Sequence, residues 1–67
     1  MNLTTTEERV QFIKGRIAER KAFARRQRLQ ALDSTISEAE SEEYVRLAEL
    51  AEEYATAQER TLLVLFP

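Results

Sequence analysis

The sequence predicts an all-α protein, an antiparallel helical hairpin that is completed as a homodimeric four-helix bundle. Three observations lead to this prediction. The 67 residues include only one glycine and one proline, Gly15 and Pro67, so little interrupts a helix after Thr6. Apolar side chains recur at helical spacing on both sides of a polar segment near mid-chain. A basic first half precedes an acidic second half, and two such helices can pair.

The first helix is expected over about residues 6–32. Two T-x-x-E pairs stand before it, Thr4 with Glu7 and Thr5 with Glu8, and either has the capping-box spacing in which a threonine oxygen accepts an amide hydrogen bond. The apolar residues expected to share one face of this helix are Val10, Ile13, Ile17, Ala24 and Ala31, with Leu32 at its edge and Ala18, Ala22 and Leu29 on its flank.

The segment 33–37 is predicted to be the turn, because its short polar side chains compete for backbone hydrogen bonds. Ser37 precedes Glu40 by the spacing of a second capping box. The second helix is therefore expected over about residues 38–65. Its contact face is predicted to hold residues that are three and four apart, namely Tyr44, Leu47, Ala51, Tyr54, Gln58, Thr61 and Leu65.

Two helices of similar length joined by a short turn pack antiparallel. Folding about mid-turn makes the numbers of facing residues add up to about 69, which predicts ion pairs between the helices. The predicted pairs are Arg20 with Glu49, Arg25 with Glu43, Arg28 with Glu42, and Lys14 or Arg16 with Glu52 and Glu53. Exposed pairs are worth only about 0.2–1 kcal/mol each, so they are expected to set direction and register.

A single domain covering residues 1–67 is expected, and it needs support beyond its own core. At this size, burial barely offsets an ordering entropy of about 1.5 kcal/mol per residue. The chain has no cysteine for a disulfide and no histidine for a zinc site. A homo-oligomer of hairpins is the expected solution, with Gly15 splitting the first helix into a three-helix domain as the alternative.

Catalysis is not expected, and neither are a cofactor, a metal site or a small-molecule substrate. Without histidine or cysteine there is no imidazole base and no thiolate, and glutamates on a solvated face titrate near their usual pKa. The longest apolar run, 62–66, is far short of the roughly 20 residues that span a membrane. The polar residues 1–9 do not fit a secretory signal, so a cytoplasmic location is expected.

The basic stretch 14–28 carries seven cations and only one acidic residue, Glu19. These cations could pair with the acidic second helix or contact phosphates. Two phenylalanines lie opposite the predicted core face, where they could form a second packing surface or stack on unpaired bases. The residues assigned to a nucleic-acid surface are Phe12, Arg16, Phe23 and Arg26.

In layout, this arrangement resembles the Rop-type plasmid regulators, which are dimeric antiparallel hairpins. The likeness rests on the segment 12–14, Phe-Ile-Lys, and on a turn near mid-chain. The resemblance implies binding of paired RNA loops through a polar, basic and aromatic face of the first helices. It is a likeness of architecture and does not make the chain a member of that family.

The second helix and the apolar segment 62–66 form the other predicted surface. This segment is apolar on every side of a helix, so it must be covered by self-association, near Met1, Leu3 and Val10, or by a groove on another protein. The acidic side could occupy a basic nucleic-acid groove of a partner. The residues assigned to protein contact are Glu42, Glu49, Glu52, Glu53, Glu59, Leu62, Leu63, Leu65 and Phe66.

These features predict a non-catalytic, self-associating helical interaction module that acts as a small regulator or inhibitor of a macromolecular protein partner. An RNA- or DNA-binding regulator using the basic first helix is the alternative. A structural assembly subunit with no partner beyond itself is a second alternative.

Overall fold

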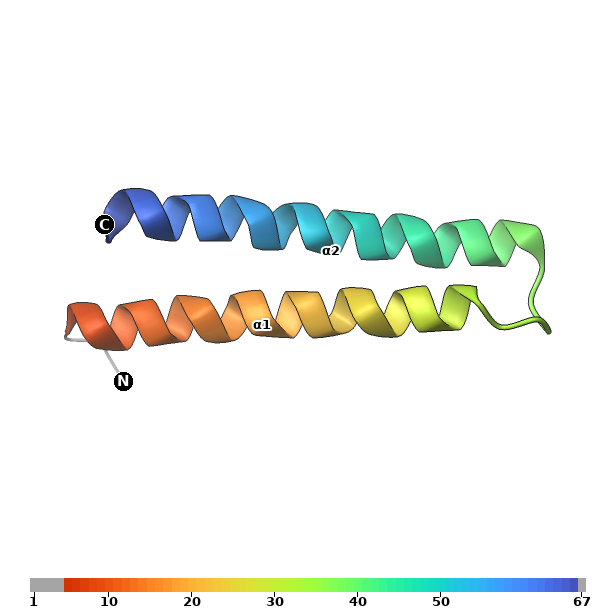
Figure 1. Cartoon of the computed structure of the whole chain (residues 1–67), viewed down its shortest axis with the longest axis horizontal. Coiled ribbons are helices and arrows are strands. Elements are labelled where there is room, and N and C mark those ends of the chain that lie inside the picture. Colours follow the sequence, from red (N-terminus) through yellow and green to blue (C-terminus); the bar gives the residue numbers. More distant parts are fainter. Residues whose placement is uncertain (1–4, 67) are drawn as a thin grey trace.

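The computed structural model describes residues 5–66 and contains two helices within them, α1 (Thr6–Ala31) and α2 (Glu38–Leu65). The helices lie side by side and antiparallel, joined at one end by a short turn (Figure 1). The described residues contain no strand. The predicted all-α hairpin is confirmed, and the helix bounds differ from the expected ones by one residue, at the end of α1.

The start of α1 is fixed by Thr5, whose hydroxyl oxygen accepts a hydrogen bond of 3.0 Å from the backbone N–H of Glu8. Of the two capping pairs that the sequence allows, this is the one formed. The helix then continues through Gly15 without interruption, and the alternative three-helix domain is wrong. A glycine costs a helix only about 1 kcal/mol, which the contact along the rest of α1 offsets.

The turn is ordered by Asp33, whose carboxylate accepts hydrogen bonds from both the N–H and the hydroxyl of Thr35, at 2.8 and 2.7 Å. The hydroxyl, followed by the N–H, lowers the pKa of Asp33. This local bonding gives the backbone an alternative to helix, so α1 stops within one residue of the predicted end.

Two serines begin α2 and join it to α1. Ser37 and Glu40 form the predicted capping box, with the Ser37 hydroxyl accepting from the Glu40 N–H at 3.1 Å. The hydroxyl of Ser41 donates a hydrogen bond of 2.7 Å to the carbonyl oxygen of Ala31, in the last turn of α1. Because an end carbonyl of a helix lacks an intrahelical donor, this bond satisfies it and fixes the angle between the helices.

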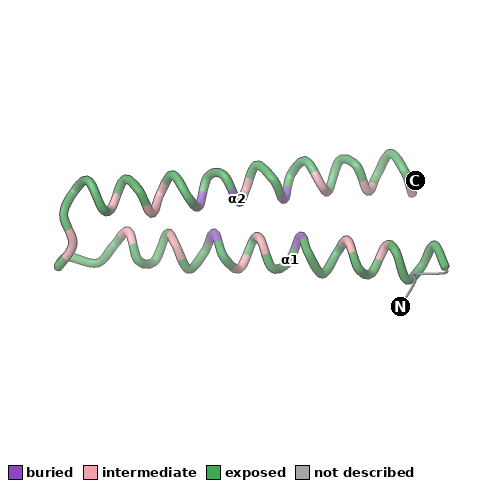
Figure 2. The backbone as a smooth tube through the Cα atoms, turned by 180° about the vertical axis from the view of Figure 1, so that it is seen from behind, coloured by how far each residue is buried: buried purple, intermediate pink, exposed green. Residues whose placement is uncertain are grey.

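The contact between the helices is made mainly of small side chains. Figure 2 shows the buried residues on the sides of the helices that face each other. They are Ile17, Ala24, Ala48, Ala51 and Ala55. Alanines spaced by three, four and seven residues return to the same side of a helix and let the two backbones approach closely.

The predicted contact face is confirmed for the central stripe of α1, wrong for Leu29 and Leu32, which are 69% and 80% exposed, and partly wrong for α2. In α2, Leu47, Tyr54 and Leu65 are exposed, with exposed fractions of 36%, 58% and 61%. Thr61 is exposed as well. Ala48 and Ala55 follow two of these residues directly, while Ala51 belongs to both faces, so the true face is rotated by about 70° from the predicted one. In α2, the large apolar residues form a periodic stripe in the sequence, but the alanines beside them make the close contact with α1.

The register of the ion pairs also differs from the prediction. Arg28 pairs with Glu52 at 2.6 Å and Lys21 with Glu59 at 3.3 Å, instead of the predicted partners. The residue numbers of these pairs add up to about 80, because every side chain leans toward the N-terminus of its own helix and antiparallel neighbours lean toward each other.

Residues of the other predicted pairs also bond to partners that were not predicted. Arg20 bonds to Gln58 instead of a glutamate, at 3.0 Å. Glu43 pairs within its own helix, with Arg46 at 3.1 Å, and Glu52 is already held by Arg28. The prediction assumed that residues at the same height along the two helices bring their charged groups together. Long side chains lean along the helix, so their charged groups meet partners at other heights.

The hairpin is one layer thick. It measures 48 × 23 × 13 Å along its principal axes, and a helix with its side chains is about 10–12 Å across. Neither described helix has an apolar stretch long enough to cross a membrane. Met1 and Leu3, predicted to lie near the apolar segment 62–66, fall outside the described residues. A single layer leaves both broad sides of the hairpin open.

Candidate interaction surface

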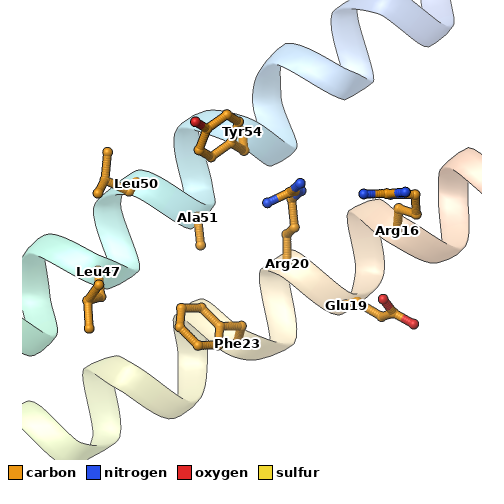
Figure 3. Close-up of a pocket in the computed structure, with 8 residues that line it drawn as sticks. All are labelled: Arg16, Glu19, Arg20, Phe23, Leu47, Leu50, Ala51 and Tyr54. Carbon is orange, nitrogen blue, oxygen red and sulfur yellow. The ribbon is translucent and has the colours of Figure 1, made fainter.

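One broad side of the hairpin carries an open groove of about 460 Å³ that crosses from α1 to α2. We call its large apolar residues, Phe23, Leu47, Leu50 and Tyr54, the apolar face. Figure 3 shows Phe23 projecting from α1 and the other three from α2 around the groove. Their exposed fractions run from 36% to 58%, although they are among the largest side chains of the protein. They are therefore available to a partner.

Arg20 stiffens one end of the apolar face. Its Nε donates a hydrogen bond of 3.0 Å to the side-chain oxygen of Gln58, and its guanidinium carbon lies 4.8 Å from the centre of the Tyr54 ring. A cation over an aromatic ring at this distance is attracted to the ring's negative face. Arg20 thus reaches from α1 toward the Tyr54 ring on α2 (Figure 3), and more than half of Tyr54 stays exposed.

The opposite broad side, which we call the charged face, is closed by ion pairs between the helices. Its pairs are Lys21 with Glu59 and Arg28 with Glu52. At about 100° per residue, Arg28 points about 140° away from Phe23 around α1. The hydrogen bond from Arg28 lowers the pKa of Glu52 and raises that of Arg28. The two sides of the hairpin therefore differ in chemistry.

Of the four residues assigned to a nucleic-acid surface, Arg16 and Phe23 line the groove, and Phe12 and Arg26 lie about 20° and 60° from Phe23 around α1. The guanidinium of Arg16 lies 5.9 Å from the Phe12 ring centre, and that of Arg26 lies 6.0 Å from the Phe23 ring centre. Phe12 is more than half exposed. Each ring thus has a cation beside it, and Phe23 belongs to the apolar face at the same time.

The residues assigned to protein contact are not brought together into one site. Glu52 and Glu59 are held by cations of α1, while Glu42, Glu49 and Glu53 are exposed. In the apolar segment, Leu62 and Phe66 are half-buried. Leu63 and Leu65 are exposed, at 71% and 61%. Part of the acidic side is neutralised by the hairpin itself.

The apolar residues of α2 are the part of this surface that sequence reasoning missed. Leu47 and Tyr54 were assigned to the contact with α1, and Leu50 was assigned to no surface. The signal that could have found them is the run of alanines at Ala48, Ala51 and Ala55, which can fill the contact and free the neighbouring large residues for a second one.

No other kind of site emerges from the described residues. Within residues 5–66, no three acidic side chains lie close enough to hold a metal ion. Every buried side-chain polar atom in this range has a hydrogen-bond partner. The chain matches no known protein family, no curated protein and no solved structure. The apolar face is therefore the strongest candidate for a functional surface.

Proposed function

We propose that the protein is a non-catalytic interaction module that self-associates through its apolar face, so that two hairpins form a four-helix bundle. One observation carries this proposal. The hairpin is a single layer whose contact buries mostly alanines, while its larger apolar side chains stay on the outside. Domains ordinarily bury the apolar side of one layer against a second layer.

The energetics favour a second layer. Burying a large apolar side chain contributes about 1.5–3 kcal/mol, whereas alanine has little apolar area to bury. The outline of one whole broad side, 48 by 23 Å, is about 1,100 Å², and a stable interface needs about 800 Å² from each partner, so most of that side has to take part in the contact. A second copy supplies a matching surface of the same size and chemistry.

The apolar face is a better candidate for this contact than the charged face. Ion pairs such as Arg28 with Glu52 already satisfy the charges of the other side, and covering them would remove water from them without a new partner. Covering Leu47, Leu50 and Tyr54 removes water from apolar side chains and carries no such cost of desolvating charges. This asymmetry supports pairing through one side only, which yields a closed dimer instead of an open array.

Such a dimer would present its charged faces outward, in position to bind a larger macromolecule as a regulator or inhibitor. Of the acidic residues assigned to that role, Glu42, Glu49 and Glu53 carry their charge at the exposed surface. The role of this acidic surface in the basic groove of a partner stays a prediction.

The proposal is tested by measuring the molar mass of two matched variants by light scattering. Leu50→Glu places a charge in the centre of the apolar face, and Thr56→Glu places the same charge at an exposed position of the same helix, on the charged face. We expect Leu50→Glu to lose the dimer while Thr56→Glu keeps it. If both variants keep the mass of the wild type, the apolar face is not the contact.

Nucleic-acid binding is a second candidate function, favoured by the pairing of Arg16 with the ring of Phe12 and of Arg26 with that of Phe23. Arginine planes and aromatic rings are the groups on which unpaired bases stack. We expect poly(U) binding that weakens with salt and with Arg16→Glu. The control is Arg46→Glu, which removes a cation of α2 that pairs with Glu43. Equal binding by both variants would dismiss this function.

A further inference from the structure

We infer that Arg20 determines the specificity of the apolar face, because it places a charged group at the floor of the groove and excludes assemblies that bring no hydrogen-bond acceptor to it. This inference rests on the proposed self-association. It adds the residue that limits which assemblies form, and it holds for any orientation of the second copy.

Arg20 lies between the contact with α2 and the open side of the hairpin. At about 100° per residue, it stands about 60° from the exposed Phe23 and about 40° from the buried Ala24 around α1. Figure 3 shows its side chain reaching from α1 into the groove, beside Tyr54 of α2. Arg20 is already half-buried in the single hairpin. It therefore belongs to the floor of the groove.

Gln58 holds the matching position on α2. It is also half-buried, and it stands about 40° from Tyr54 and about 60° from the buried Ala55 around the helix. Its side-chain oxygen accepts the 3.0 Å hydrogen bond from Nε of Arg20, and the Tyr54 ring centre lies 4.8 Å from the guanidinium carbon. A second layer that covers Tyr54 thus also covers the Arg20–Gln58 bond.

The charge of Arg20 is not neutralised by the hairpin. Among the residues that the structure describes, its side chain makes no ion pair, and Gln58 is the acceptor of its hydrogen bond. The terminal nitrogens of a guanidinium carry further N–H groups, and here these depend on water. Covering them with apolar side chains removes that water and leaves the donors without acceptors, which is unfavourable.

This cost selects among assemblies. Leucines such as Leu47 and Leu50 pack on many apolar surfaces, so they do not by themselves fix how many copies associate. An assembly is favoured only if it gives Arg20 an acceptor, which is either a polar group of another copy or water at the edge of the contact. In coiled coils, a single polar residue in the core likewise lowers stability and fixes the number of chains. Arg20 thus lowers the affinity of the contact and raises its specificity.

The test replaces both members of the bond with apolar side chains, in the double variant Arg20→Met with Gln58→Leu. Removing a buried charged group together with its partner removes the cost of covering it and can strengthen an assembly. We expect the dissociation constant of the dimer to fall by about tenfold or more in sedimentation equilibrium. We also expect light scattering to show masses above that of the dimer, which the wild type does not form.

The control is the double variant Lys21→Gln with Glu59→Gln. It removes the neighbouring link between the helices, the 3.3 Å ion pair on the charged face, and leaves the groove unchanged. We expect its dissociation constant to stay the same or to rise, with the dimer as the only assembly. A helical circular dichroism spectrum would show that each variant still folds. A control that gains affinity as much as the Arg20 variant would overturn the assignment of the effect to Arg20.

The outcomes separate this inference from the proposed function. An Arg20→Met, Gln58→Leu protein that dissociates as readily as the wild type, or more readily, overturns the inference. A tighter variant that still forms dimers only overturns the specificity role of Arg20. In both cases, a wild type of twice the chain mass leaves the proposed self-association standing. A wild type with the mass of a single chain at every concentration overturns the proposed function and this inference together.

Discussion

Side-chain size decides the role of each apolar residue in this hairpin. Ala48 is fully covered by α1, whereas its neighbour Leu47 retains 36% exposure. A methyl group leaves room for two backbones to approach, and a leucine at the same position would hold them apart. The larger residues are therefore displaced to the broad side of the molecule, where they form the apolar face.

Gly15 offers a direct test at the residue scale. It lies inside α1, and a Cβ added there would meet no other atom within 4 Å. Gly15→Ala should therefore raise the free energy of unfolding by about 0.5–1 kcal/mol, because alanine loses less backbone entropy in a helix. Ala18→Gly, at an exposed position one turn later, should lower it by a similar amount in urea titrations. A Gly15→Ala variant no more stable than the wild type would contradict an unbroken α1.

The pKa of Glu52 and that of Asp33 are both lowered in the folded chain. A carboxylate of this kind adds stability above its unfolded pKa, about 4, and loses that contribution as pH falls through the lower folded value. Urea titrations should thus show the wild type losing stability below about pH 4. Glu52→Gln should make this loss smaller, and parallel pH curves for the two proteins would contradict the role of the Arg28–Glu52 pair.

At the level of the elements, the sequence was sufficient for the helices and insufficient for how α2 faces α1. Glycine and proline usage and the capping residues Thr5 and Ser37 determine helix bounds locally, and these predictions held within one residue. The rotation of α2 depends on which of two adjacent stripes packs on α1. Only the facing helix decides between them, and single-helix periodicity carries no information about that helix.

The same limit explains the candidate site. Phe12 and Phe23 were recognisable from the sequence as an exposed aromatic pair, because α1 has only one apolar stripe to bury. Leu47 and Tyr54 were not recognisable as exposed residues. The helix α2 has two adjacent apolar stripes, and its own sequence does not show which of them is buried. The groove became visible only when α1 and α2 were placed beside each other.

The alanine contact between α1 and α2 can be tested by overpacking. Ala48→Leu should destabilise the hairpin by about 1–3 kcal/mol, even though leucine is a good helix former, because the contact has no room for three more carbons. Ala18→Leu, at an exposed position of α1 away from the apolar face, should change the free energy of unfolding by less than about 0.5 kcal/mol. Equal effects of the two substitutions in thermal or urea unfolding would show that the helices do not pack through the alanines.

On the scale of the whole molecule, one layer with an apolar and a charged side would form half of the proposed bundle. The 67-residue chain buries little within itself, so its stability should depend on the second copy and hence on protein concentration. The charged faces remain outside in such a dimer. In the proposed dimer, this division would let one side of the hairpin hold the assembly together while the other contacts further macromolecules.

The most direct test of self-association is the light-scattering mass of the wild-type protein on a sizing column at low salt, with absorbance at 260 and 280 nm recorded. We predict a protein-only species of twice the 7.8 kDa chain mass that dissociates and loses helix on dilution. A folded species of 7.8 kDa at every concentration would contradict pairing through the apolar face. Excess absorbance at 260 nm that raised salt removes would instead favour nucleic-acid binding through α1.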